Sequence, residues 1–283
     1  MDIGGSPAEN LVMRDSNPGQ VSIRPGGVGR NIAHNLCLLG MDLSFITALG
    51  GDLYAASLRE NCGALGMDLS MTLSLPERRS SVYLYINDEK GDMQLAVSDM
   101  DIVNCISAEF LSRHIEEINS YSALVIDANL PEQSIEYLAK NCRIPLYADP
   151  VSTAKAKKLI PYIDKFYAIK PNAIEAEALT GEKEPEKAAK RLIEMGLKRA
   201  FVSCGNMGIV AAEGDTLIHI PCAPAKIVNT TGSGDAATAA IVWAGVNGMS
   251  LSKSAQAGVI AGAITAECLE ANNPGLNKLK NLL

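Results

Sequence analysis

The clearest opportunity for chemistry lies near the end of the chain, where residues 229–235 read NTTGSGD and an apolar, helix-like run follows over residues 236–246. Two glycines one residue apart let the backbone turn tightly, so that several N–H groups point at one place. The start of the helix adds its own unpaired N–H groups and the positive end of its dipole. The pattern therefore predicts a pocket for an anion, such as a phosphoryl group in transit.

Asp235 lies at the mouth of this predicted pocket. A carboxylate at that place could orient a hydroxyl group and accept its proton. A second interpretation is that the glycines form a simple turn and that Asp235 caps the helix. The heptapeptide alone favours neither interpretation, so the rest of the chain decides between them.

A second motif, KPNAIE at residues 170–175, places Asn172 and Glu175 three residues apart. That spacing is typical of a helix-capping arrangement, which needs no ligand. The functional interpretation is that the two residues, through water, hold a Mg²⁺ ion bound to nucleotide phosphates. Magnesium keeps most of its waters, so one or two protein oxygens suffice.

Two glycine-rich motifs complete the set of candidates. Residues 203–208 read SCGNMG, which is either a glycine turn or a surface that lets nucleotide phosphates or ribose lie against the backbone. Residues 26–31 read GGVGRN, which lacks the spacing of a dinucleotide-binding fingerprint and follows no clear strand. Its functional interpretation is a bare glycine surface for a sugar ring, with Asn31 hydrogen-bonding the sugar hydroxyls.

Alternating strands and helices must position these motifs. Strands are expected over residues 123–127, 145–148, 166–169 and 200–203, and helices over residues 134–141, 173–179 and 184–195. This rhythm predicts right-handed βαβ units and a parallel sheet with helices on both faces. Ligands bind beyond the carboxyl ends of the strands in such sheets, and the polar motifs follow those ends. Their agreement favours the functional interpretations.

The amino-terminal third carries a different pattern. The expected elements are a helix over residues 31–39, a strand over 43–49, a helix over 53–65 and a hairpin within 80–102. Residues 21–23 could pair with the hairpin. We therefore predict a small antiparallel sheet outside the main fold.

Composition excludes several classes of protein. The chain has 283 residues, of which 47% are hydrophobic and 20% charged, as in ordinary globular proteins. Its net charge of −7 argues against nucleic acid or an anionic membrane as the main partner. No apolar run reaches the roughly 20 residues that span a bilayer. Without a signal-peptide pattern, and with seven dispersed cysteines, we expect a cytoplasmic protein with reduced thiols and no structural metal site.

Taken together, these residues resemble the ribokinase/PfkB family of carbohydrate and nucleoside kinases over essentially the whole chain. The diagnostic pieces are GGxGxN at residues 26–31 and TGSGD at residues 231–235, in this order and separation. Within the family the chain is most similar to the pseudouridine kinases. The supporting stretches are DSNPG at residues 15–19, SDMDI at 98–102 and DPVS at 149–152, which lie in or near the lid and sugar site.

The resemblance implies a single ribokinase-like domain over residues 1–283. Its α/β fold would be a three-layer Rossmann-type sandwich with a small antiparallel β lid, formed by segments near residues 11–25 and 80–102. Family members usually begin with a strand that leads to an Asp that binds sugar hydroxyls. Asp2 is similar to that residue, so we expect the first family strand to be missing before residue 2. Lid sheets in this family often pair, which implies a homodimer through the lid.

The resemblance also implies ATP and Mg²⁺ as cofactors and gives each motif a role. Asp235 would be the catalytic base, and the N–H groups of Gly232, Ser233 and Gly234 would stabilise the transferring phosphoryl group. The remaining roles are substrate binding by Asp2, Gly26, Gly27 and Asn31, and ATP or phosphate binding by Asn172, Glu175, Ser203, Gly205, Gly208 and Thr231, with Glu175 also reaching Mg²⁺ through water. Many relatives have Asp in place of Asn229, where it helps to bind a monovalent cation, so potassium activation is not expected here.

The activity implied is ATP-dependent phosphorylation of the 5′-hydroxyl of pseudouridine, which gives pseudouridine 5′-phosphate. One alternative is a PfkB-type kinase of a free sugar or another nucleoside, such as ribose, fructose or 2-keto-3-deoxygluconate. A remote alternative is a non-catalytic nucleoside-binding protein. The intact Asp235 and its glycines argue against that last class.

Overall fold

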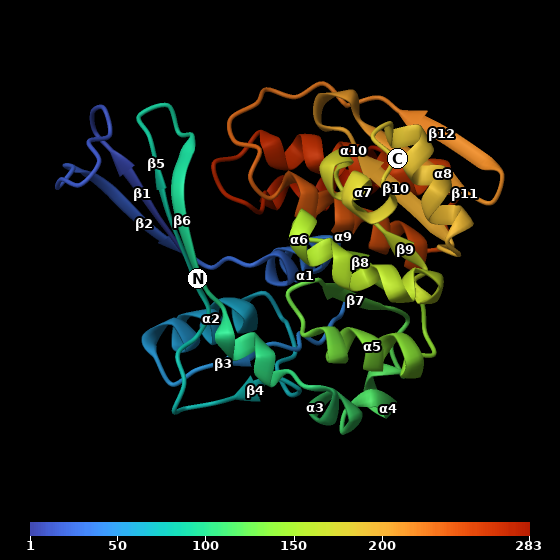
Figure 1. Ribbon diagram of the computed structural model, residues 1–283, viewed down its shortest axis with the longest axis horizontal. Helices are drawn as coiled ribbons and strands as arrows, with labels where there is room; N and C mark the ends of the chain where they lie inside the picture. Colours follow the sequence, from blue (N-terminus) through green and yellow to red (C-terminus); the bar gives the residue numbers. More distant parts are fainter. The chain divides into compact units, whose positions relative to one another are not determined.

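The computed structural model describes residues 1–283, which divide into two compact units. The larger unit comprises residues 28–43 and 107–283. Its six-stranded sheet has the order β12-β11-β10-β9-β8-β7 (Figure 1). The strands are β7 (Leu124–Asp127), β8 (Leu146–Asp149), β9 (Ala168–Ile169), β10 (Arg199–Ser203), β11 (Ile209–Glu213) and β12 (Thr216–Ile220). Strands β7 to β10 run parallel, and β11 and β12 extend the sheet as an antiparallel edge.

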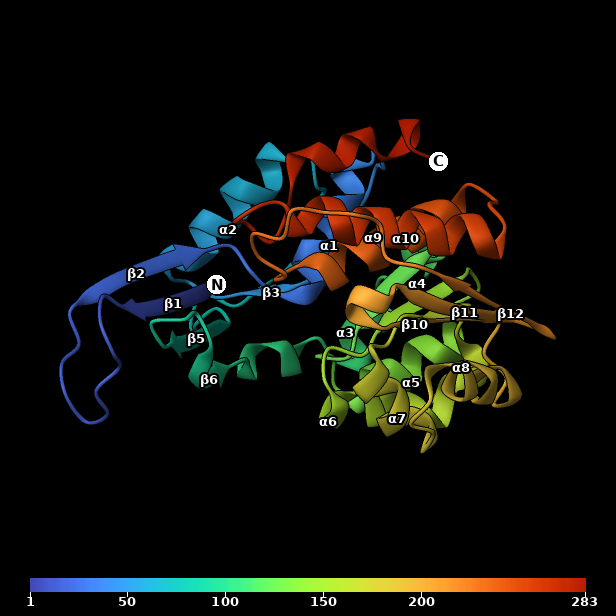
Figure 2. The ribbon, with the colours of Figure 1, turned by 90° about the horizontal axis from the view of Figure 1, so that it is seen from above.

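Helices cover both faces of this sheet. Figure 2 shows α1, α9 and α10 on one side of the strands, and α5, α7 and α8 on the other. Their bounds are α1 (Val28–Leu38), α5 (Glu132–Asn141), α7 (Ala173–Thr180), α8 (Pro185–Glu194), α9 (Ser233–Val246) and α10 (Leu251–Ala266). The shorter helices are α3 (Ala108–Ser112), α4 (Ile115–Ile118), α6 (Thr153–Ala156), and the 3₁₀ segments η2 (Lys157–Lys165), η3 (Gly205–Met207) and η4 (Pro274–Asn281). None of the helices is both long and apolar enough to cross a membrane.

The core of this unit is built around α9. Nearly every residue of this helix after Asp235 is buried, because its sequence is apolar on all sides. Alanines at positions 236, 239, 240 and 244 are fully buried, and their small side chains let neighbouring elements approach closely. Helix α9 packs in one cluster with residues of α1, α10 and the sheet, including Ile32, Tyr147 and Phe201. The N-terminus of α9 is thereby held firmly.

The smaller unit comprises residues 1–27 and 44–106. Its main feature is a four-stranded sheet of order β2-β1-β5-β6 (Figure 1). The strands are β1 (Asp2–Pro7), β2 (Gly19–Arg24), β5 (Val82–Asn87) and β6 (Met93–Asp99). The unit also contains α2 (Leu53–Ala64), a short parallel pair of β3 (Ala48–Leu49) and β4 (Leu73–Ser74), and the 3₁₀ segment η1 (Asp101–Cys105).

Most of the predicted elements are confirmed, including the doubly covered α/β sheet and the hairpin of β5 and β6. Two details differ. Residues 43–49 form only the two-residue strand β3 and one isolated bridge at Ser44, so the strand predicted there was too long. Strand β2 does not pair with the hairpin, because β1 lies between them, antiparallel to β2 and parallel to β5.

Gly232 is the N-terminal cap of α9, and two features of its backbone require glycine. Its φ of 83° lies in the left-handed region, and a Cβ added there would lie 2.1 Å from the carbonyl oxygen of Ala271. Gly234, two residues later, has no positive φ, and its nearest neighbour would be the Nζ atom of Lys170 at 3.5 Å. The two glycines of the motif therefore differ in what they tolerate.

We predict that Gly232→Ala lowers the free energy of unfolding by about 2 kcal/mol or more, because both the backbone conformation and the Ala271 carbonyl oppose a side chain. At roughly 2–4 °C per kcal/mol, the fall in Tm is about 4–8 °C in a thermal unfolding scan. Gly234→Ala is the matched control and should unfold close to the wild-type temperature. Equal Tm values for the two variants would contradict this assignment.

Candidate active site

Charged side chains gather at the carboxyl ends of three neighbouring parallel strands. Asp127 ends β7 and Asp149 ends β8, and the register of the sheet places these two residues side by side. Lys170 follows β9 directly. Thr238 of α9 donates a hydrogen bond from Oγ1 to Oδ2 of Asp149 (2.7 Å), which ties α9 to this edge of the sheet. The geometry therefore places the start of α9 over the strand ends.

The start of α9 presents backbone N–H groups without partners. The helix begins at Ser233, earlier than the sequence indicated, with Gly232 as its cap. The N–H of Ser233 donates to the carbonyl of Thr230 (3.2 Å), whereas those of Gly232, Gly234 and Asp235 make no hydrogen bond. The amide set predicted from sequence included Ser233. In the structure, the backbone N–H groups left without a hydrogen bond are those of Gly232, Gly234 and Asp235.

The side chain of Ser233 lies next to α10. Its Oγ atom is buried without a hydrogen-bond partner, and a Cβ on Gly262 of α10 would lie 4.0 Å from its Cβ. Of the four residues predicted for catalysis, Ser233 is the one whose backbone N–H is engaged by a neighbouring carbonyl.

Asp235 lies in the first turn of α9 and is held by Asn31 of α1. The Nδ2 atom of Asn31 donates to Oδ2 of Asp235 at 2.8 Å. Burial and, after it, the nearby charge of Asp149 raise the pKa of Asp235 to about 7, against the opposing effects of the bond from Asn31 and the charge of Lys170. A carboxyl group that titrates near neutral pH can both accept and return a proton. Asn31 thus supports Asp235, a contact that the sequence did not predict.

Lys170 supplies the positive charge of the site. Its Nζ atom lies 3.6 Å from Oδ2 of Asp149, and both side chains are only 7% exposed. The same Nζ atom lies close to Gly234 at the start of α9. A buried ammonium beside free amides makes this place suitable for a phosphate group. The motif at residues 170–175 predicted no role for Lys170 itself, although the position of this lysine directly after a buried strand was a usable signal.

Asp127 fixes the start of α1 and therefore the position of Asn31. Its Oδ2 atom accepts from the N–H of Gly29 in the first turn of α1 (2.9 Å). Asn129 holds the same carboxylate through its backbone N–H and its Nδ2 atom, both at 2.9 Å. A carboxylate at a helix N-terminus is favourable. Burial raises the pKa of Asp127, and these hydrogen bonds counter the rise.

Asn229 braces the loop that leads into α9. Its Nδ2 atom donates to the carbonyl of Leu269 (2.9 Å), and its Oδ1 atom accepts from the N–H of Thr231 (3.0 Å). An aspartate could not donate to Leu269. Thr231 is exposed beside the free amides of α9. The side-chain amide of Asn229 thus ties its own loop to the carbonyl of Leu269 and to the N–H of Thr231.

Asn172 and Glu175 form a capping box at the start of α7. The side chain of Asn172 accepts from the N–H of Glu175 (2.8 Å), and Glu175 Oε2 accepts from the N–H of Asn172 (2.9 Å). Glu175 is buried, which raises its pKa; Asp149 adds to the rise and Lys170 opposes it. The motif therefore forms the helix-capping arrangement, which is one of the two interpretations of its sequence.

The motif at residues 203–208 separates into two parts. Gly208 has a φ of 98°, and an added Cβ would lie 2.0 Å from the carbonyl oxygen of Ile220, so its role is to pack against the end of β12. Gly205 has open space around it. Ser203 donates from both its N–H and its hydroxyl to the carbonyl of Pro171. Of these residues, Gly205 best fits a surface against which a ligand lies.

Three predicted substrate-binding residues belong to the smaller unit. A Cβ on Gly26 would lie 2.0 Å from the carboxyl group of Asp2, so only glycine fits there without displacing that carboxylate. Gly27 has a φ of 98° and no neighbour within 4 Å of an added Cβ. The structure therefore brings Asp2 and Gly26 together at one end of β1.

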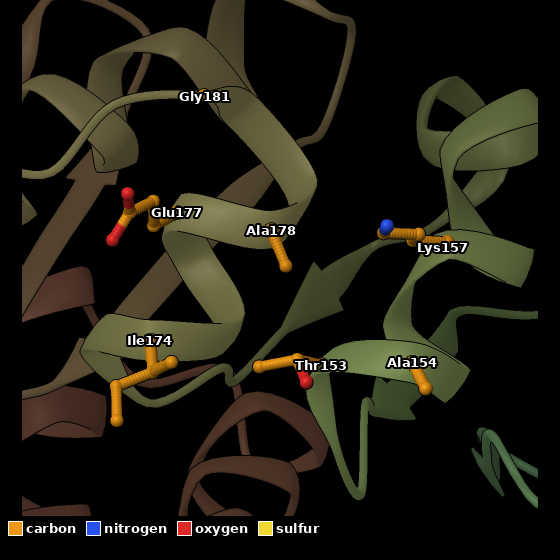
Figure 3. Close-up of a pocket in the computed structure, with 7 residues that line it drawn as sticks. All are labelled: Thr153, Ala154, Lys157, Ile174, Glu177, Ala178 and Gly181. Carbon is orange, nitrogen blue, oxygen red and sulfur yellow. The ribbon is translucent and has the colours of Figure 1, made fainter.

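One surface hollow, of about 550 Å³, lies between α6 and α7 (Figure 3). Its lining residues are Thr153, Ala154, Lys157, Ile174, Glu177, Ala178 and Gly181. None of the residues predicted for the site lines it. No group of three or more His, Cys, Asp or Glu side chains is placed to hold a metal ion directly.

The chain matches the pfkB family carbohydrate kinase model over residues 7–278. It is 34% identical to the pseudouridine kinase of Escherichia coli (strain K12), over 98% of this chain and 91% of that protein. Among solved structures, a carbohydrate kinase from Agrobacterium tumefaciens aligns with a TM-score of 0.85 at 28% identity, covering 98% of this chain and 92% of that one. The ribokinase of Thermotoga maritima has a TM-score of 0.86 at 21% identity, covering 99% and 96%, which shows a common fold. The chain therefore belongs to the pfkB family of carbohydrate kinases.

Proposed function

We propose that the protein transfers the γ-phosphoryl group of ATP to the 5′-hydroxyl of pseudouridine. The observation that carries this proposal is the placement of the Asp235 carboxylate, held by Asn31, at the end of α9 that presents unpartnered amides. The choice of pseudouridine as acceptor is supported by the similarity, over nearly the whole chain, to the pseudouridine kinase of E. coli.

In the proposed reaction, Asp235 orients the 5′-hydroxyl for in-line attack on the γ-phosphorus. The new O–P bond forms as the bond to the β-phosphate oxygen breaks, ADP leaves, and the hydroxyl proton passes to Asp235. The transition state is loose, so the base is needed late and its required strength is modest. A carboxylate with a pKa of about 7 meets that requirement.

The amides of Gly232, Gly234 and Asp235 bind the charge on the transferring group. Lys170 adds a buried positive charge next to Gly234. Donors fixed in place by the fold need no rearrangement as the charge develops, and removing a single one typically costs about 3 kcal/mol in catalysis. The geometry of α9 is thus the main source of stabilisation in this proposal.

The remaining assignments concern the ribose, the nucleotide and its metal. Asp2, Gly26 and Gly27 would bind the sugar hydroxyls, and Thr231 and Gly205 would contact the phosphates. Mg²⁺ would screen the charge of the ATP phosphates. Glu175 and Asn172 would hold waters of that ion, because a hydrated ion needs few protein oxygens. We expect no requirement for potassium, since the Asn229 amide already bridges the loop.

The acceptor is tested with a coupled assay of ADP release. We predict the highest kcat/KM for pseudouridine among pseudouridine, uridine, ribose, fructose and 2-keto-3-deoxygluconate, since the chain is 34% identical to the pseudouridine kinase of E. coli over nearly its whole length. A higher kcat/KM for another compound would support the kinase activity but would show that pseudouridine is not the preferred acceptor. Tight pseudouridine binding by calorimetry without ADP release would instead favour a binding protein.

Asp235→Asn should lower kcat by about 10² to 10⁴-fold with little change in ATP affinity, since it removes the base but not the amides. Asp164→Asn is the control, because Asp164 is exposed and pairs only with Lys165. Calorimetry with a non-hydrolysable ATP analogue measures the affinity. Undiminished kcat in the Asp235 variant would remove the proposed base.

The pH dependence follows from the raised pKa of Asp235. Below a pKa of about 7 the carboxyl group is protonated and cannot accept a proton, so kcat/KM should rise roughly tenfold per pH unit up to pH 7 and then level off. The contribution of Asp235 to the free energy of unfolding changes in the opposite direction. Burial favours the protonated carboxyl group, so this contribution is lost as the pH rises from the unfolded pKa to the folded pKa of about 7. A flat kcat/KM between pH 5.5 and 8.5 would contradict the assignment of the base.

We propose in addition that the protein is a homodimer through the four-stranded sheet of the smaller unit. The register aligns Ile23, Ile3, Leu84 and Val97 in one row across that sheet, and Val21, Gly5, Ile86 and Leu95 in the next row on the same face. Val21, Ile23, Leu95 and Val97 are each more than half exposed. A contiguous exposed apolar face of this kind is typical of an interaction site, and a second copy would bring an identical apolar face.

Val97→Glu should convert this dimer into a monomer in sedimentation equilibrium, because a carboxylate would be buried in the interface. Ser98→Glu places the same charge on the opposite face and serves as the control. A wild-type protein that sediments as a monomer at micromolar concentration would contradict the proposed dimer.

A further inference from the structure

We propose that Arg30 is a positioning residue, which fixes the side-chain amide of Asn31 so that its Nδ2 atom faces Asp235. The functional meaning of this inference rests on the proposed role of Asp235 as the base. The positioning itself is a property of the folded protein and is measured without any reaction.

Arg30 lies on α1, immediately before Asn31, and its guanidinium group is buried; the residue is 7% exposed. Its Nη1 atom donates to Oδ1 of Asn31 (3.0 Å) and to Oδ1 of Asn272 (2.9 Å). Its Nη2 atom lies 3.0 Å from Nδ1 of His34. The guanidinium therefore joins one turn of α1 to a residue more than 240 positions away in the sequence.

The two partners of Asn31 permit only one orientation of its amide. A guanidinium group can only donate hydrogen bonds, and an ionised carboxylate can only accept them. Oδ1 of Asn31 must therefore face Arg30, and Nδ2 must face Asp235. In the flipped orientation, Nδ2 would meet the Arg30 donors and Oδ1 would meet the carboxylate, so both contacts would become repulsive. Arg30 thus selects the orientation that supports the ionised form of Asp235.

Arg30 is itself held by acceptors on both sides. Asn272 accepts from Nη1, and its Nδ2 atom donates to the backbone carbonyl of Asn31 (3.1 Å). Burial, followed by the charge of Arg30, lowers the pKa of His34 to about 4, so its ring is neutral at pH 7. The Nδ1 atom of a neutral ring can accept from Nη2 when the proton is on Nε2. The planar guanidinium matches these acceptors, and an ammonium group has no such fork.

The bond from Asn31 acts on Asp235 together with several charges. Asp149 of β8 and Asp127 of β7 raise the pKa of Asp235, and Lys170 lowers it. The donor from Asn31 also lowers the pKa, because it stabilises the charged form. Loss of the correct amide orientation should therefore raise the pKa of Asp235 and move the pH profile of kcat/KM towards higher pH.

The test is the pKa of Asp235, measured by ¹³C NMR of protein labelled at the aspartate carboxyl carbons. The resonance is identified by its absence in Asp235→Asn. In Arg30→Met we expect the acid dissociation constant of Asp235 to fall about tenfold, which is a rise of roughly one unit in its pKa. Arg30→Lys should show a similar shift, because it keeps the charge but loses the fork. Arg143→Met, at an exposed arginine paired with Glu116, is the matched control and should show no shift.

A double-mutant cycle shows whether Arg30 acts through Asn31. Asn31→Ala should itself raise the pKa of Asp235, and adding Arg30→Met to that variant should have no further effect. An unchanged pKa in folded Arg30→Met, or equal and additive shifts in the two backgrounds, would overturn the proposal. If Arg30→Met does not fold, Asn272→Ala removes one brace of the guanidinium and gives the same readout, and an unshifted pKa there would overturn it too.

Kinase assays keep this inference separate from the proposed function. A shifted pKa without activity towards any acceptor would leave the positioning role intact and remove the reaction. Kinase activity that depends on Asp235, together with a pKa of Asp235 that does not change in Arg30→Met, would keep the proposed reaction and remove the positioning role of Arg30. Where both hold, the lower limb of the kcat/KM profile should move by the same amount as the measured pKa.

Discussion

The hydrogen bond from Asn31 to Asp235 is the contact on which the site depends. Burial and the neighbouring carboxylate of Asp149 both oppose a negative charge on Asp235, and they raise its pKa to about 7. The donor on α1 and the ammonium of Lys170 keep the charged form within reach of neutral pH. A carboxylate base with a pKa of about 7 needs both the burial that raises its pKa and the donors that stabilise its charge. Less support would leave the carboxyl group protonated, and less burial would leave it a weaker acceptor.

The fold supplies this balance by anchoring two helices to the same edge of the sheet. Asp127 holds the start of α1, and Asp149 holds α9 through Thr238. The alanine-rich body of α9 packs inside the core and anchors the helix against α1, α10 and the sheet. The amides of that turn remain free, because Gly232 adopts a left-handed conformation against Ala271 that no other residue tolerates well. Position and charge in the site thus both trace back to packing.

The sequence predicted the scaffold better than the contacts within the site. The parallel strands β7, β8 and β10 were predicted to within one residue at each end, because buried strands are continuous apolar runs. Strand β1 was missed because its sequence, DIGGSP, has little strand propensity and is held by pairing with β2 and β5. The strand expected over residues 43–49 was too long, because apolar residues alone do not provide pairing partners.

The motif residues were recognisable from sequence, whereas their connections were not. Asn31 and Asp235 are 204 positions apart, and nothing local to either residue predicts their hydrogen bond. The role of Lys170 and the bracing of Arg30 by Asn272 depend on tertiary packing in the same way. Ser233 illustrates the converse, since its motif position suggested a free amide and the turn at Thr230 engages it.

The ionisation of Asp235 in the wild-type protein tests this account most directly. A ¹³C NMR titration of the aspartate carboxyl carbons should show one resonance, absent from Asp235→Asn, that titrates near pH 7. It should also shift when the acceptor nucleoside is added. A carboxyl group at position 235 that titrates near pH 4 and does not respond to the nucleoside would contradict the proposal that the half-buried Asp235, supported by the side-chain amide of Asn31, activates the acceptor.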